Sequence, residues 1–473
     1  MPYPAGATGV HRCGAALLAM TQGALLIAAP AVVSQGNSPM LAALREWRTP
    51  LVVAVALLAA LRMCRGDVGG KKSPPRACAM LPYGPLIVLL IATFAALASL
   101  WQDTALRQQR DAARVEDAAG RAVGAHLMVG YTRFDEVALL ARRGLIGGVY
   151  LTRRNVRDRD VGEIRAEIDT LQALRREAGL PPLLVAADQE GGEVAHMSPP
   201  LPAPASLASL LRASEGDGAA QASELTARAR AHGLAQGGQL ARLGVNLNFG
   251  PVVDLVPQRP PPRNIAAKLT QLDTHTRLRT RAISGDAGTV TLVARAYNDG
   301  LLSAGVRPTL KHFPGLARVG VDTHHRLGRI DEPLAELATS DWQPFASLTH
   351  SGAAIMVGHV VLNAIDPQEP ASLSSKVIVG LLRERWGFTG LVVTDDLNMG
   401  AVARRGVGQA AVHALAAGAD VALISYDPAQ VYAALLAGRR ALEAGELDAN
   451  ALQISARRIA HAVGANGRSQ PMM

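Results

Sequence analysis

Short apolar runs alternate with amphipathic stretches along most of the chain after residue 120. Amphipathic segments such as EIRAEIDTLQALRREAG separate most of the runs. Strands that alternate with helices are typical of a parallel sheet, and eight strands favour closure into a barrel. We therefore expect an α/β fold, a (β/α)8 TIM-type barrel, over 121–465, followed by a disordered tail over 466–473. The eight apolar runs lie at 126–130, 147–151, 182–188, 245–254, 306–312, 353–359, 391–396 and 420–426.

The first hundred residues have a different pattern, in which longer apolar segments replace the alternation. These segments lie at 15–33, 49–61 and 77–102. A bilayer core requires about 20 apolar residues, so the third segment is long enough and the second is short. We expect two or three membrane-anchoring helices within 1–102, joined by a polar linker over 103–120 to the barrel. A signal-peptide-like first segment and a mistaken start codon remain alternatives.

Charge is distributed unevenly and bears on the orientation of these segments. The net charge is +9, and residues 1–115 carry 11 of the 48 basic but only 4 of the 39 acidic residues. The basic residues between the second and third segments outnumber those just after the third, and the positive-inside rule keeps the denser group in the cytoplasm. We expect the catalytic domain to be membrane-anchored on the outer, periplasmic side.

Composition excludes several classes of site. The barrel region has no basic stripe with interleaved aromatic residues, so no nucleic-acid partner is expected. Cys13, Cys64 and Cys78 all lie in the N-terminal part, with spacings that fit no zinc site. Aromatic residues make up only 4% of the chain, so the core should be aliphatic.

Polar side chains stand where the predicted strands end. Any one of them could be a helix cap or a structural hydrogen-bond donor. The carboxyl ends of barrel strands share one face, where enzymes of this architecture hold their active sites. Convergence of several such ends therefore favours a catalytic site. The residues concerned are Asp188, Asp254, Lys311, His312, His359 and Asp395.

Two segments carry a resemblance to a known family. KHFPGLARVGVDTH (311–324) and TDDLNMGA (394–401) resemble the KH(F/I)PG(H/L)G…D(S/T)H and SDDLSM segments of family 3 glycoside hydrolases, of the bacterial β-N-acetylhexosaminidase type. The similarity covers roughly 130–430. Further matching segments are YLTRRN (150–155), DQEGG (188–192), NLNFGPVVD (246–254) and GHVVLNAIDPQEPASLSSKVI (358–378).

The resemblance implies retaining hydrolysis of terminal non-reducing β-N-acetylglucosamine, with peptidoglycan muropeptides as the expected carbohydrate partner. It implies Asp395 as nucleophile and His324 as proton donor, oriented by Asp322, with Asp396 in a supporting or helix-capping role. The residue types suit the chemistry, because a carboxylate must attack one face of the sugar while an acid protonates the leaving group. Histidine titrates near neutral pH. Both groups are protein side chains, so we expect no cofactor and no metal.

Substrate-binding residues are carried over by the same resemblance. It implies that Asp188, Lys311 and His312 bind sugar hydroxyls. Arg281 matches a family arginine loosely, and a solvated arginine is the alternative. Met399 is implied in the acetamido pocket, with a core methionine as the alternative.

The chain departs from the family pattern at three positions. Ala317 replaces a glycine, Glu193 follows DQEGG where an arginine is usual, and His196 replaces a sugar-binding arginine. The segment 254–281 is also longer and richer in proline. We expect an active, monomeric enzyme. A β-glucosidase or phosphorylase of the same superfamily, and a non-catalytic membrane-tethered glycan-binding module, remain alternatives.

Overall fold

The computed structural model describes residues 84–213, 218–257 and 276–464. The chain divides into two compact units, Met1–Asp111 and Ala112–Met473. Helix α3 (Gly84–Ala113) contains most of the third apolar segment and part of the expected linker. Within the described ranges, no helix has both the length and the hydropathy that crossing a membrane requires. The prediction of membrane helices is thus not confirmed, and the first two segments and the tail lie outside the described residues.

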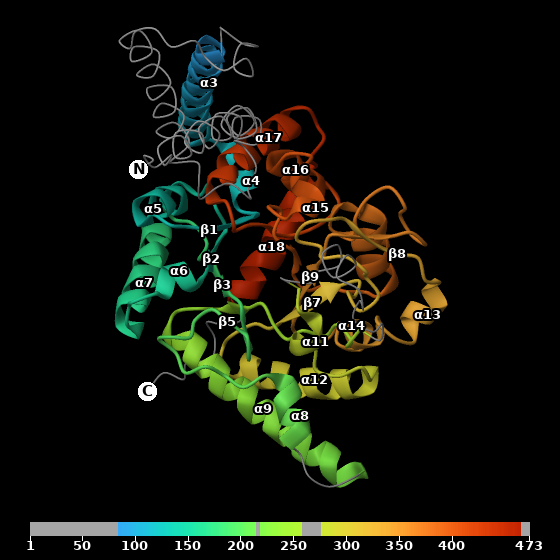
Figure 1. Cartoon of the computed structure of the whole chain (residues 1–473). Helices are drawn as coiled ribbons and strands as arrows, with labels where there is room; N and C mark the ends of the chain where they lie inside the picture. Colours follow the sequence, from blue (N-terminus) through green and yellow to red (C-terminus); the bar gives the residue numbers. More distant parts are fainter. Residues whose placement is uncertain (1–83, 214–217, 258–275, 465–473) are drawn as a thin grey trace, which may run out of the picture. The chain divides into compact units, whose positions relative to one another are not determined.

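Strands and helices alternate through the second unit, as expected (Figure 1). Each of the eight predicted runs contains a strand, and every pairing among these strands is parallel, in the orders β12-β1-β2-β3-β6 and β11-β9-β7. The α/β class is therefore confirmed. The strands are β1 (Leu127–Gly130), β2 (Gly148–Leu151), β3 (Leu184–Ala187), β6 (Leu247–Asn248), β7 (Thr309–Phe313), β9 (Ala354–Val357), β11 (Val392–Thr394) and β12 (Ala422–Ile424).

Isolated parallel bridges link the two sheets at both junctions. Leu247 bridges to Arg307, and Val393 bridges to Val421. Backbone hydrogen bonds accompany them, including Thr394 N–H to the Val421 carbonyl at 2.9 Å. Because all eight strands run in one direction, their carboxyl ends lie at the same edge.

Side chains along the strands alternate between two hydrophobic clusters, since successive strand residues point to opposite faces. One cluster takes Met128, Leu184, Met356 and Val393 from four strands, together with Ala462 of α18 (Ala449–Gly464). The larger cluster takes the intervening positions, which pack against the helices. Few members of either cluster are aromatic, as the composition predicted.

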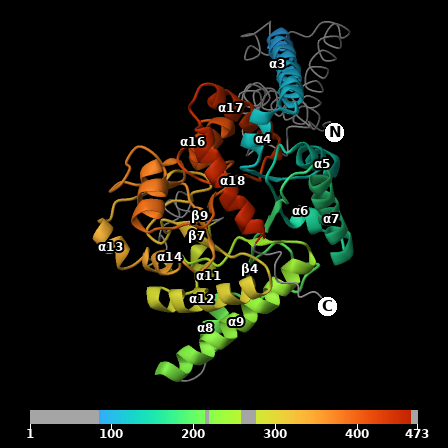
Figure 2. The ribbon, with the colours of Figure 1, turned by 180° about the vertical axis from the view of Figure 1, so that it is seen from behind.

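Helices and short elements surround the strands. Helices α9 and α12 run side by side in both views (Figures 1 and 2), and glycines permit their close approach. A Cβ on Gly233 would lie 2.2 Å from the Tyr297 carbonyl oxygen. These helices include α4 (Ala118–Gly124), α5 (Phe134–Arg143), α7 (Val161–Glu177), α9 (Gly218–Arg242), α12 (Ala287–Ser303), α16 (Val407–Ala416) and α17 (Val431–Glu443). Shorter elements include α8 (Leu207–Ala213), α11 (Leu278–Arg281), α13 (Leu334–Ala338), α14 (Gln343–Ser347), α15 (Gly400–Ala403), the π-helix η4 (Lys376–Arg385), β4 (Gln189–Gly191), β8 (Gly328–Ile330) and β10 (Val360–Leu362).

Candidate active site

Lys311 and His312 lie near the carboxyl end of β7, and both side chains contact carboxylates at the carboxyl edge of the strands. In a regular strand, two neighbouring residues point to opposite faces. The register of β7 against β9 shifts between Leu310 and Phe313. An irregularity of this kind redirects a side chain, which explains how two consecutive residues serve the same site.

Lys311 belongs to a cluster in which every charge has an opposite partner. Its ammonium contacts the carboxylates of Asp188 and, at 2.6 Å, Glu190. Arg281 donates to both oxygens of Glu190, at 2.9 and 2.6 Å. The Tyr150 hydroxyl donates to Asp188 at 2.5 Å. Two cations and two carboxylates thus hold one another in a fixed arrangement.

The pairing keeps this cluster ionised. Burial by itself raises the pKa of Asp188 and Glu190, but the neighbouring cations lower both pKa values below their usual range. Burial by itself lowers the pKa of Lys311, and the two carboxylates raise it above its usual value. Arg281 is only 9% exposed, so its interpretation as a solvated arginine is wrong.

Asp254 fixes the position of His312. One carboxylate oxygen accepts the His312 backbone N–H at 2.9 Å and lies 2.7 Å from the imidazole Nδ1. The other oxygen accepts the backbone N–H of Leu316 at 2.8 Å. Since Nδ1 is engaged by a fully buried carboxylate, a substrate hydroxyl at this imidazole would meet Nε2.

Asp395 follows β11 directly and lies among three histidines. Its backbone N–H donates to the Val357 carbonyl of β9 at 2.9 Å. Burial raises the pKa of Asp395, but the imidazoles of His312, His359 and His324 outweigh burial and lower this pKa below its ordinary value. The carboxylate is therefore ionised at neutral pH, as a nucleophile must be.

His324 and Asp322 form a hydrogen-bonded pair. The imidazole Nδ1 lies 2.9 Å from an Asp322 oxygen that also accepts the His324 backbone N–H at 3.0 Å. The Thr276 hydroxyl donates to the same oxygen at 3.3 Å. Burial lowers the pKa of His324, whereas Asp322 and Asp395 raise it above its ordinary value. The imidazole thus favours its protonated form, which a proton donor requires.

A backbone contact joins the loop of His324 to the segment after Asp395. The Gly400 N–H donates to the His324 carbonyl at 2.7 Å. A Cβ on Gly400 would lie 3.0 and 3.1 Å from the carbonyl oxygens of His325 and His324, so a larger residue would push the loop away. Together with their mutual electrostatic influence, this contact brings His324 and Asp395 into one site.

Asp396 ties β11 to β12. Its carboxylate accepts the Ser425 hydroxyl at 2.6 Å and backbone N–H groups of Asn398, Ser425 and Tyr426 at 2.9–3.1 Å. These four bonds occupy the carboxylate, which matches the supporting role expected for it. Met399 precedes α15 and is 6% exposed.

The departures from the family pattern fall in different places. His196 is in the site, where its Nδ1 lies 3.3 Å from the Tyr150 hydroxyl, and burial lowers its pKa. Glu193 is exposed and pairs with Arg277 at 3.2 Å. Ala317 packs against the larger hydrophobic cluster. Much of the proline-rich segment, 258–275, lies outside the described residues.

Several residues at the site were given no role from the sequence, among them Asp254, which holds His312. Glu190 stands two positions after Asp188, and this spacing was its available signal. His359 was noted at a strand end but given no role. It is fully buried, with Nδ1 2.7 Å from the Ser372 hydroxyl and Nε2 3.0 Å from the Asp396 carbonyl. In the described part of the chain, no group of three His, Cys, Asp or Glu residues is arranged to hold a metal ion.

Comparison with known proteins settles the family. Residues 122–462 match the model of the glycosyl hydrolase family 3 N-terminal domain. The chain belongs to glycosyl hydrolase family 3. Among the relatives of this family 3 protein is a β-hexosaminidase of Xylella fastidiosa strain 9a5c. It is 39% identical over 310 residues, which cover 62% of this chain and 81% of the relative. The relatives indicate that this family 3 protein is a glycoside hydrolase.

Solved structures agree with this assignment. A family 3 β-N-acetylglucosaminidase from Paenibacillus sp. FPU-7 matches with a TM-score of 0.64 and 30% identity, covering 75% of this chain and 64% of that one. A β-N-acetylhexosaminidase from Beutenbergia cavernae DSM 12333 matches with a TM-score of 0.63 and 30% identity, covering 74% of this chain and 100% of that one.

Proposed function

We propose that this family 3 enzyme is a β-N-acetylhexosaminidase that removes terminal, non-reducing β-N-acetylglucosamine with retention of configuration. One observation carries the proposal: His324, held by the Asp322 carboxylate at 2.9 Å, is joined by the Gly400 hydrogen bond to the segment that follows Asp395. The names of the relatives support the substrate class. The parallel bridges at both sheet junctions support closure of the eight strands into a (β/α)8 barrel.

In the first step, an Asp395 oxygen attacks the anomeric carbon and the glycosidic C–O bond breaks. His324 transfers its proton to the departing oxygen, so a glycosyl ester of Asp395 and a free alcohol result. In the second step, neutral His324 takes a proton from water, whose oxygen attacks the same carbon and releases Asp395. Two displacements on one carbon retain its configuration.

Around this pair, Asp188, Lys311 and His312 orient the sugar through its hydroxyls. Arg281 contributes through Glu190, whose two oxygens it engages. Their mutual pairing holds these side chains in place before the sugar arrives, which lowers the entropic cost of orienting it. Met399 borders the acetamido group, and His196 takes the place of the family's sugar-binding arginine beside Tyr150.

We further infer that the natural substrates are muropeptides from peptidoglycan and that the catalytic unit acts, as a monomer, on the outer side of the membrane. The distribution of basic residues before and after 77–102 supports this orientation. Protease digestion of the catalytic unit in intact cells, compared with permeabilised cells, tests it. Protection in cells with an intact inner membrane, followed by digestion once that membrane is permeabilised, would contradict a location on the outer side.

Purified full-length protein tests the proposed activity. It should hydrolyse an aryl β-N-acetylglucosaminide faster than the matching aryl glucoside, with a product of retained configuration seen by proton NMR. The rate should not depend on inorganic phosphate. A preference for the glucoside, or release of a sugar phosphate when phosphate is added, would overturn the assignment in favour of the related glucosidase or phosphorylase.

A further inference from the structure

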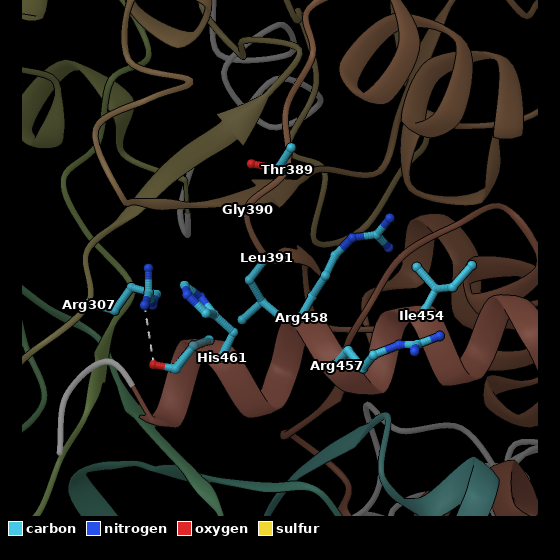
Figure 3. Close-up of a pocket in the computed structure, with 9 residues that line it drawn as sticks. Arg307, Thr389, Gly390, Leu391, Ile454, Arg457, Arg458 and His461 are labelled. Carbon is cyan, nitrogen blue, oxygen red and sulfur yellow. Dashed lines mark hydrogen bonds between the residues drawn. The ribbon is translucent and has the colours of Figure 1, made fainter. Parts of the chain in front are cut away.

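A cationic pocket lies at the amino ends of β7 and β11, away from the carboxyl edge that holds Asp395. Its volume is about 350 Å³, within the range of pockets that hold small molecules. The lining includes Arg307 from the start of β7 and Leu391 from the start of β11, and the face of α18 completes it. Figure 3 shows the α18 residues on neighbouring turns, with Arg307 approaching the end of that helix.

Three arginines and a histidine line this pocket, and its lining includes no carboxylate. Ile454, Arg457, Arg458 and His461 recur at helical spacing, so α18 presents them on one face. Arg458 pairs with the buried Asp420 at 3.1 Å, but Asp420 also pairs with Arg383 at 2.6 Å. The single negative charge of Asp420 is therefore shared by two arginines.

Arg307 contributes a buried positive charge that no carboxylate of the described residues balances. Its side chain is inward-facing, because it lies two and four positions before the inward Thr309 and Lys311. The residue is only 8% exposed, and its guanidinium donates to the carbonyls of Gly352 and Ala462. Its buried Nε has no hydrogen-bond partner in the described structure. Burial lowers the pKa of Arg307, and no carboxylate opposes this effect.

We infer that this pocket binds a small phosphate monoester. Within the described ranges, neither Arg307 nor Arg457 has a carboxylate partner, so at least two positive charges are uncompensated. A phosphate monoester carries a charge of about −1.5 to −2 at pH 7, whereas a carboxylate carries one. Guanidinium groups match phosphate oxygens in geometry. The apolar wall of Leu391 and Ile454 leaves room for an organic body beyond the phosphate.

The site is separate from catalysis, because the strands place it at the opposite end from Asp395. The proposal therefore does not depend on which glycoside is hydrolysed. A bound phosphate should stabilise the fold without competing with the sugar, since ligands that bind only the folded state raise its stability.

Isothermal titration calorimetry of the full-length protein tests the proposal, with glucose 6-phosphate and inorganic phosphate as probes and glucose and acetate as controls. We expect saturable binding of the phosphates alone. The double variant Arg457→Gln/His461→Gln should weaken glucose 6-phosphate binding at least about tenfold. Arg440→Gln, an exposed arginine on α17 outside the pocket, should leave binding unchanged.

Absence of saturable binding of both soluble phosphates and of phosphatidic acid vesicles to the wild-type protein would overturn the inference, as would equal affinity in the double variant. Hydrolysis of an aryl β-N-acetylglucosaminide and circular dichroism show whether the variants are folded. Vesicles with and without phosphatidic acid identify the source of the phosphate. Binding that requires phosphatidic acid and is lost in the double variant supports a lipid headgroup, whereas binding of the soluble probes alone supports a free phosphate ester.

Discussion

The two ends of the strands treat charge in opposite ways, and β7 connects them. At its carboxyl end, Lys311 is balanced by Asp188 and Glu190, and Glu190 is balanced again by Arg281. At its amino end, Arg307 is also buried, but among the described residues its side chain donates hydrogen bonds only to backbone carbonyls. Buried charges are costly unless they are paired. At the carboxyl end the charges of the protein balance one another. At the amino end a bound anion would balance Arg307.

The two ends are prepared for their ligands in different ways. Internal pairing fixes side chains in advance, which suits chemistry that depends on exact distances. Unbalanced charge leaves a site that gains stability only when its ligand arrives. Loss of any one charge at the carboxyl end should therefore lower activity or stability. Loss of a charge at the amino end should have little effect on stability until the anion is added.

The largest effect is expected from Asp395→Ala. Removal of the nucleophile should lower kcat by about 10³-fold or more, because no other carboxylate replaces it at the anomeric carbon. Steady-state kinetics on an aryl β-N-acetylglucosaminide provide the measurement. Asp169→Ala on the exposed face of α7 is the matched control and should retain activity. Near wild-type turnover in the Asp395 variant would end the assignment.

Glu190→Gln tests the balanced cluster. The substitution leaves Arg281 without its carboxylate and should destabilise the catalytic unit by about 3–5 kcal/mol, measured by urea unfolding. Because the pKa of Glu190 is lowered in the fold, its contribution is present above the unfolded pKa of about 4 and is lost as pH falls. The variant should thus show less loss of stability on acidification than the wild type.

Glu193→Gln is the control for that experiment. Glu193 is also paired with an arginine, but its side chain is 48% exposed, and exposed pairs contribute about 0–1 kcal/mol. Equal destabilisation by the two substitutions would contradict the distinction between a buried, balanced cluster and a surface pair.

Asp322→Asn should lower kcat/KM by roughly tenfold to 100-fold and shift its pH profile. Asp322 raises the pKa of His324, and the reaction needs the protonated imidazole. Without the carboxylate, His324 loses its proton at lower pH, so the alkaline limb of the profile should move to lower pH. An unchanged alkaline limb would show that another group donates the proton.

The smallest effect is expected from Arg457→Gln at the amino end. In phosphate-free buffer, Tm should change by no more than about 2 °C, because no carboxylate partner is lost. With glucose 6-phosphate, the wild type should gain more in Tm than the variant. Strong destabilisation without ligand would show that Arg457 has a structural partner instead of an external one.

Local patterns predicted the strands well, and they indicated several residues that come together in the candidate site. Each apolar run contains a strand, because burial on both faces leaves a continuous signal in sequence. The segments 311–324 and 394–401 carry the proposed reacting groups in short, contiguous patterns. Membrane helices, by contrast, were predicted from hydropathy, and within the described residues none is confirmed.

Partners distant along the chain could not be predicted in the same way. Glu190 is significant because of Arg281, 91 positions later, and no local pattern connects them. Arg307 was counted within an apolar run, and its position gave no indication of the three basic residues of α18. Whether a buried charge has an opposite partner depends on which helices and strands pack together, and this packing is known only from the folded structure.

The hydrogen bond from Gly400 to the His324 carbonyl joins the loop of the proposed acid to the turn that follows the proposed nucleophile. A displacement of the turn after β11 carries both groups with it, so their separation is buffered against motion of the surrounding loops. Selection for rate would therefore act on Gly400, although this residue has no side chain. An enzyme engineered for bulkier glycosides should be altered at other positions around the active site before this turn is changed.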